Sequence, residues 1–83
     1  MARFRNKAAI EAVQINNNAE EVQAFIGDKG TAIDTDHGTL VTLDCIGGLM
    51  SAGNNAYITK DPISGQYFIW SKDTFEENYE KVD

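Results

Sequence analysis

The stretch Thr39-Leu40-Val41-Thr42-Leu43-Asp44-Cys45-Ile46 decides the fold class of this chain. Within it, apolar and polar side chains alternate over residues 41–45. Because successive side chains of a strand point to opposite faces, this alternation predicts a half-buried β-strand. The turn residues Asp36-His37-Gly38 come just before it and follow a second β-rich stretch, residues 31–35. This order predicts a β-hairpin in which Gly38 is free to take a positive φ.

Four more strands are predicted, at residues 8–15, 49–52, 56–60 and 66–71, separated by Asn-, Gly- and Pro-containing turns. The last one, Gln66-Tyr67-Phe68-Ile69-Trp70, is apolar on both faces. A strand of this kind is either covered on both sides or buried against a partner.

Two short helices are predicted, the first at residues 18–27. Asn18 and Glu21 form a capping-box pattern, and Gly27 or Gly30 is suited to end the helix. Four apolar residues between them share one helical face: Ala19, Val22, Phe25 and Ile26.

The second predicted helix spans residues 73–82. Asp73 and Glu76 form another capping-box pattern, and Phe75, Tyr79 and Val82 make a narrow apolar stripe that should dock on the sheet. We therefore expect an α+β fold: a small curled antiparallel sheet or open barrel of about five to six strands, with two short helices. Residues 8–83 form a single domain, and residues 1–7 form a basic tail or the start of a strand.

Charge is unevenly distributed along the 83 residues. Arg3, Arg5 and Lys7 lie at the start, whereas from Ala8 onward four lysines stand against thirteen acidic residues, a formal balance of −9. A body this acidic repels phosphates, which argues against direct binding to nucleic acid. No apolar run approaches the roughly 20 residues of a membrane span, so we expect no membrane partner.

Few residues are candidates for a catalytic nucleophile, a general base or a metal ligand, and for each of them we prefer a structural role to a catalytic one. His37 lies in the predicted turn, and the single Cys45 is in phase with the buried side of its strand. Asp34, Asp36 and Asp44 could converge across the hairpin as an acid/base pair or a divalent-cation site. Asp34-Thr35-Asp36-His37-Gly38 resembles the start of a cation loop, but no bidentate Glu follows at the required distance, so we interpret these acids as turn and strand-face residues. We expect no enzyme activity, no cofactor and no metal. A free Cys in a chain without a disulfide suits a reducing cytoplasm.

Two surfaces are candidates for binding a partner protein. Tyr57, Tyr67 and Trp70 crowd one hairpin, where they form either core packing or an interface; Trp and Tyr are enriched at interface hot spots. The second candidate is the acidic side of the C-terminal helix, which suits a partner with a basic surface. Its residues are Asp73, Glu76, Glu77 and Glu80.

Five short motifs follow one another along nearly the whole chain. They are Ala8-Ala9-Ile10-Glu11-Ala12-Val13-Gln14, Gly48-Leu49-Met50-Ser51-Ala52, Gly53-Asn54-Asn55-Ala56-Tyr57-Ile58, Gly65-Gln66-Tyr67 and Asp73-Thr74-Phe75-Glu76-Glu77-Asn78-Tyr79-Glu80. This order resembles a family of short, mostly uncharacterised proteins of tailed bacteriophages and prophages. Asn54 and Gln66 depart from that family's pattern, which usually has an acid at the first position and Glu at the second.

The resemblance implies a non-enzymatic accessory protein that acts in the cytoplasm of the infected bacterium by binding a host or phage protein. Inhibition of a host defence system, as by an anti-CRISPR, is one role that it implies. Two alternatives stay open: a binder of a small ligand such as a nucleotide signal, and a minor structural or assembly protein of the virion. A homodimer is also open, because 83 residues enclose little pocket volume.

Overall fold

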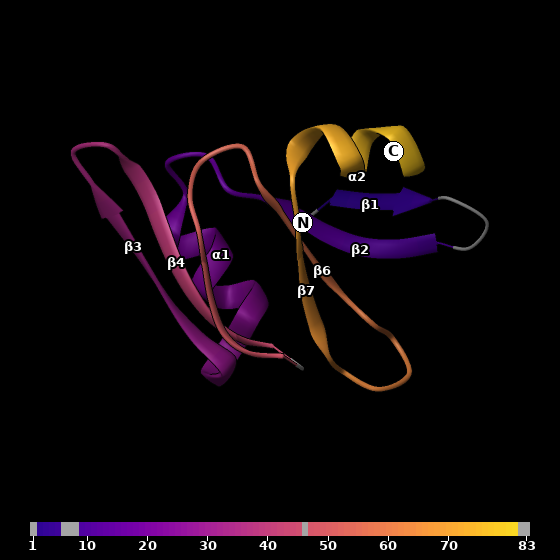
Figure 1. The fold of residues 1–83 in the computed structure, drawn as a ribbon, viewed down its shortest axis with the longest axis horizontal. Helices are drawn as coiled ribbons and strands as arrows, with labels where there is room; N and C mark the ends of the chain where they lie inside the picture. The colour runs from indigo at the N-terminus through magenta and orange to yellow at the C-terminus, as the bar shows by residue number, and fades with distance from the viewer. Residues whose placement is uncertain (1, 6–8, 46, 82–83) are drawn as a thin grey trace.

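The computed structural model describes residues 2–5, 9–45 and 47–81, and the side chains of residues 11–45 and 47–79. Its elements, in chain order, are β1 (Ala2–Arg5), β2 (Ala9–Gln14), α1 (Ala19–Ile26), the 3-10 helix η1 (Gly27–Lys29), β3 (Gly30–Thr35), β4 (Gly38–Cys45), β5 (Gly48–Ala52), β6 (Tyr57–Lys60), β7 (Tyr67–Trp70), α2 (Lys72–Asn78) and β8 (Glu80–Lys81). They form two sheets, sheet A with the order β7-β6-β2-β1-β8 and sheet B with the order β3-β4-β5 (Figure 1).

The predicted α+β class is confirmed. All paired strands are antiparallel, neither sheet closes into a barrel, and each of the six predicted strands coincides with one of β2 to β7. Two further strands lie at the ends of the chain, where β1 pairs with both β2 and β8. No helix in the described residues is long and apolar enough to cross a membrane.

The larger core lies between α1, sheet B and one face of sheet A. Its buried residues are Val13, Ile15, Val22, Phe25, Ile26, Val41, Leu43, Ile58 and Tyr67. The predicted inner face of α1 is confirmed, because its four apolar residues are all buried. Gly27 ends the helix at a φ of 60°, a left-handed conformation that glycine adopts without strain.

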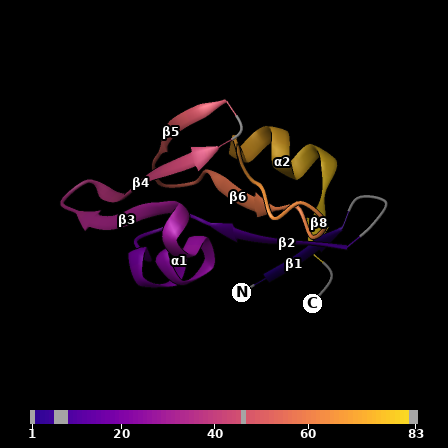
Figure 2. The same cartoon turned by 90° about the horizontal axis from the view of Figure 1, so that it is seen from below.

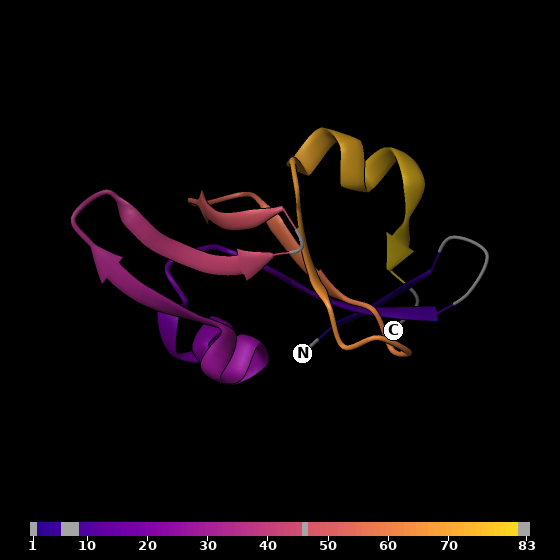
Figure 3. The ribbon, with the colours of Figure 1, turned by 60° about the horizontal axis from the view of Figure 1, so that its bottom comes forward.

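A second, smaller core lies on the opposite face of sheet A, under α2. It contains Ala12, Tyr57 and Phe75, with Trp70 and Tyr79 packed against it. Figures 2 and 3 show α1 and α2 on opposite sides of the molecule. Sheet A therefore separates the two cores.

Strand β7 contributes side chains to both cores. Tyr67 and Ile69 pack in the larger core, and Trp70 packs in the smaller one. One face of the strand therefore packs in the larger core, whereas the other is covered only in part, since Trp70 is half-buried and Phe68 is 37 % exposed.

The start of α1 differs from the predicted capping box. The Asn18 side chain caps no helix N–H; its Nδ2 donates to the Gln14 carbonyl (2.9 Å) and to Glu21 Oε1 (2.8 Å). Asp34 of β3 instead accepts from the Ala19 N–H through its Oδ1 (3.2 Å). Tertiary packing thus supplies the cap from a residue fifteen positions away in the chain.

Candidate functional site

Helix α2 begins one position earlier than predicted and uses a different cap. Ser71 is the N-cap, and its Oγ accepts from the Thr74 N–H (3.4 Å), so the predicted Asp73–Glu76 capping box is wrong. The predicted end at residue 82 is also wrong. At Tyr79 the backbone becomes extended, with φ −134° and ψ 149°. Residues 80–81 then pair with β1, and these strand hydrogen bonds replace further helical turns.

The apolar side of α2 is anchored by stacked aromatic rings. Phe75 is fully buried, and its ring stacks on Tyr57 at 4.1 Å and on Tyr79 at 4.7 Å. Trp70 meets the edges of Phe75 (6.2 Å, 71°) and Tyr79 (5.7 Å, 82°). Such pairs add about 0.5–1.5 kcal/mol each beyond area burial, so the helix is held rigidly on sheet A. The expected third member of the stripe, Val82, lies outside the described residues.

The two predicted tyrosines belong to the cores. Tyr57 is 5 % exposed and Tyr67 is 6 % exposed. The Tyr67 hydroxyl donates to the Phe25 carbonyl (2.9 Å), and its ring meets Phe25 edge to face. Neither tyrosine offers a partner much surface.

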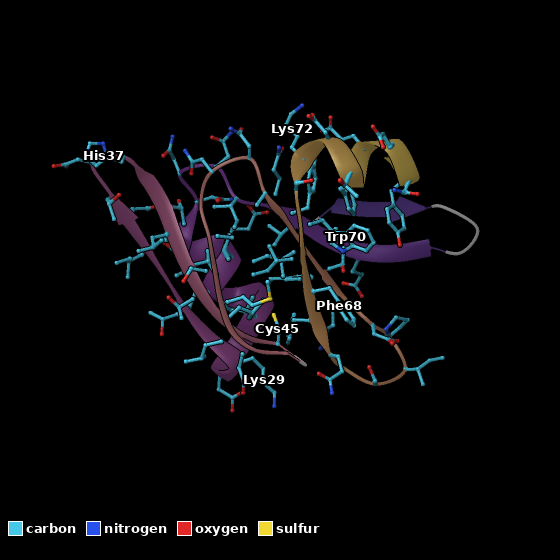
Figure 4. All side chains as sticks on the ribbon, in the orientation of Figure 1. Lys29, His37, Cys45, Phe68, Trp70 and Lys72 are labelled. Carbon is cyan, nitrogen blue, oxygen red and sulfur yellow. The ribbon has the colours of Figure 1, made fainter. Side chains whose placement is uncertain are left out.

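Trp70 is the member of the aromatic hairpin that remains half-buried. Its Nε1 donates to Thr59 Oγ1 (3.0 Å), which satisfies its polar edge inside the protein. Figure 4 shows Trp70 and Phe68 on the same side of β7, and Phe68 is 37 % exposed. The two rings form the accessible aromatic area beside α2.

Glu76 is tied into the structure by both carboxylate oxygens. Its Oε1 accepts from Lys72 Nζ (2.9 Å), and its Oε2 accepts from the Tyr57 hydroxyl (2.8 Å). The hydrogen bonds from Lys72 and Tyr57 lower the pKa of Glu76, and the bond to Glu76 raises the pKa of Lys72. Burial, and then the hydrogen bond to Glu76 and its charge, raise the pKa of Tyr57 to about 12.

Asp73 and Glu77 are exposed, as is the Glu76 side chain (44 %), but they do not share the hydrogen bonds that hold Glu76 to Lys72 and Tyr57. Together with Glu76 they form what we call the α2 acidic surface. The fourth predicted acid, Glu80, lies in β8, and its side chain lies outside the described residues.

A groove of about 590 Å³ lies beside the larger core, whose Ile26 and Tyr67 line it. It is bounded by the end of α1 with η1, the end of β4, and the turn between β6 and β7. Lys29 and Lys60 both line it, together with Asp28, Asp44 and Cys45. Lys60 also lies over the Tyr67 ring, with Nζ 5.7 Å from the centroid. No local motif in the sequence predicts this groove, because Lys29 and Lys60 are far apart in the chain.

Cys45 and His37 do not form a reactive pair. They lie at opposite ends of β4 (Figure 4), about 25 Å apart at the rise of a β-strand. Burial, and then the charge of Asp44, raise the pKa of the Cys45 thiol. The thiol therefore stays protonated near neutral pH, as suits a side chain packed against the larger core.

The three aspartates of the predicted β3–β4 hairpin do not converge. Asp34 bonds the start of α1 and Thr39 Oγ1 (2.6 Å), Asp36 lies in the turn, and Asp44 lies at the far end of β4. In the part of the chain that the structure describes, no group of three or more His, Cys, Asp or Glu side chains is placed to hold a metal ion.

No protein-family model matches this chain, and neither the curated proteins nor the solved structures contain a significant match to it.

Proposed function

We propose that this protein acts by binding another protein, and that the α2 acidic surface is the contact. The observation that carries the proposal is the pair Asp73 and Glu77, four residues apart on an exposed face of a helix that Phe75 anchors in the smaller core. Side chains four apart in a helix are neighbours, so both can meet one partner at once.

The position of Glu77 is unfavourable for the helix itself. Like charges at this spacing destabilise a helix by about 0.2–0.5 kcal/mol. The last turn of α2 contains no basic residue, and an acid there lies at the negative end of the helix dipole. A residue that destabilises its own helix is typical of a functional position, which supports a role for Glu77 in binding a partner.

The chemistry of the surface indicates a partner with a basic surface. The formal net charge is −6, so attraction extends beyond the contact and speeds the encounter. The resemblance to short proteins of tailed phages supports a host or phage protein in the infected bacterium as the partner. Inhibition of a host defence system is the role that we propose for such binding.

The test is capture from host lysate by the wild type and by two matched charge-reversal variants. Asp73→Lys/Glu77→Lys changes the proposed contact and leaves Glu76 bonded to Tyr57 and Lys72. Glu20→Lys/Asp36→Lys makes the same change in charge at exposed acids on α1 and in the β3–β4 turn. We expect the first variant to lose a protein that the wild type and the second variant retain at low salt. Equal capture by all three would show that α2 is not the contact.

A second candidate function, binding of a small ligand such as a nucleotide, is favoured by the groove that Lys29 and Lys60 line together with Asp28 and Asp44. Its volume lies within the range of about 300–1,000 Å³ that is typical of ligand sites. A nucleotide that stabilises the wild type in a thermal-shift screen, but not Lys29→Gln/Lys60→Gln, would support this function. An unchanged melting temperature across the screen would contradict it.

A further inference from the structure

Sheet B ends in two outer strands, β3 and β5, and the free edge of β3 is closed by a side chain. The amide of Gln23 on α1 takes the place of a neighbouring strand there. Its Oε1 accepts from the Ala32 N–H (2.8 Å), and its Nε2 donates to the Gly30 carbonyl (3.0 Å).

These two bonds show which backbone N–H and C=O groups of β3 face away from β4, and the orientation of the other backbone groups of sheet B follows from them. In an antiparallel pair, the N–H and C=O of one residue point to the same side, and the side alternates along the strand. Gly30 and Ala32 face α1, so Thr31 between them faces β4. Thr31 lies opposite Thr42. Thr42 therefore faces β3, and the next residue, Leu43, faces β5.

The alternation continues into β5. Met50 lies opposite Leu43, so the N–H and C=O groups of Met50 bond β4. The neighbouring residues Leu49 and Ser51 consequently turn their N–H and C=O groups toward the free edge. No backbone or side-chain group among the described residues bonds these atoms. In Figure 2, no strand lies beyond β5.

The composition of β5 leaves this edge unprotected. Natural edge strands are usually blocked by charged side chains, proline or bulges. Gly48-Leu49-Met50-Ser51-Ala52 contains neither charge nor proline, although 24 % of the residues in the chain are charged. Leu49 is 76 % exposed and Met50 is 48 % exposed.

We propose that β5 pairs antiparallel with β5 of a second copy of this chain, on a two-fold axis at Met50. This register places Leu49 opposite Ser51 of the second copy, and each pair exchanges two N–H···O bonds, which makes four in all. The strand is thus its own complement. β5 contains no charged side chain, so the β5 strands of two copies can meet without repulsion between acids. A basic partner, in contrast, is attracted to the acids of α2.

The size and charge of this contact predict a weak dimer that salt strengthens. An interface of one five-residue strand per copy belongs to the small class, below about 1,200 Å² in total. Each copy carries a formal charge of −6, so the copies repel through solvent, and salt screens that repulsion. Binding of a basic partner by α2 should respond to salt in the opposite direction, which separates the two proposals experimentally.

Sedimentation velocity on the intact chain, from about 10 µM to about 1 mM, tests the proposal in a range that detects weak association. The informative pair of variants is Ser51→Pro and Ser51→Ala. Proline removes an outward N–H that β4 does not use, and edge strands accept proline at such a position. Alanine keeps that N–H. We expect the wild type and Ser51→Ala to dimerise with rising concentration, and Ser51→Pro to associate at least about tenfold more weakly.

Leu49→Lys serves as a second variant should Ser51→Pro fail to fold, because a lysine at an edge disfavours pairing and spares the β4 ladder. We expect it to be monomeric across the same range. If the wild type stays monomeric at about 1 mM in high salt, the proposal that β5 pairs with itself is overturned. The free edge of β5 would then be available only for a strand of another protein. Dimerisation of Ser51→Pro or Leu49→Lys with wild-type affinity would also overturn it.

Discussion

The hydroxyl of Tyr57 donates a 2.8 Å hydrogen bond to Oε2 of Glu76, and this bond joins β6 to the acidic side of α2. The same tyrosine stacks on Phe75 at 4.1 Å, so it holds the helix from both its polar and its apolar side. Glu76, although its side chain is 44 % exposed, is therefore part of the attachment of α2, to which Asp73 and Glu77 make no such contribution. Charge-reversal experiments on this surface should spare Glu76 for that reason.

The Tyr57 hydroxyl should titrate near pH 12 in the folded protein. Its pKa is raised above the unfolded value of 10.0, so its contribution to stability is fully present below pH 10 and is lost as pH rises through about 12. Absorbance titration of tyrosinate in wild type and Tyr57→Phe isolates this group. In Glu76→Gln the Tyr57 pKa should fall below its wild-type value, because the negative charge of Glu76 is lost while burial, the largest cause, still raises it. An unchanged Tyr57 titration in Glu76→Gln would contradict the hydrogen bond.

Phe75→Ala should cost about 3–5 kcal/mol of unfolding free energy, because it empties the centre of the smaller core. A domain of this size has little stability to lose, so the variant should be largely unfolded or melt well below the wild type. Phe68→Ala, at a residue that is 37 % exposed, removes the same atoms and should lose much less. Urea denaturation compares the two, and equal losses would rule out a central role for Phe75.

Gly38→Ala should destabilise the β3–β4 hairpin by more than about 1 kcal/mol. Gly38 has a φ of 110°, and an added Cβ would lie 2.5 Å from the Asn54 side-chain nitrogen. Asn54 cannot easily move away, since its Oδ1 accepts from the N–H groups of Thr39 and Asn17. Gly47→Ala is the matched control, because no atom lies within 4 Å of its added Cβ. Thermal melts in which both variants resemble the wild type would refute this expectation.

The Cys45 thiol should react slowly with an alkylating reagent at neutral pH and faster only above its ordinary pKa of 9.0. The cause is burial, to which the charge of Asp44 adds. Asp44→Asn should therefore shift the rate–pH profile toward lower pH by a small amount, and denaturant should shift it further. A rapid reaction at pH 7 in the folded wild type would mean that the thiol is not protected as the structure indicates.

Local patterns in the sequence predicted the elements well, because their causes act within a few residues. The alternation at residues 41–45, the turn residues around Gly38 and the inner face of α1 each depend on near neighbours along the chain. The α2 prediction shows the limit of such reasoning. Its apolar stripe correctly named Phe75 and Tyr79, but helical periodicity could not reveal that residues 80–81 pair with β1 at the other end of the chain.

What the sequence by itself determined was therefore the α+β class, the six internal strands, the two helices and the faces that those elements bury. Tertiary structure alone decided which acid caps α1, where α2 ends, and which side of β5 faces outward. It also decided that the three exposed acids of α2 have unequal roles, since Glu76 alone among them is held by Tyr57 and Lys72 through its two carboxylate oxygens. The physical reason is common to all of these: each depends on a hydrogen bond or ring contact between residues far apart in the chain, which no local spacing encodes.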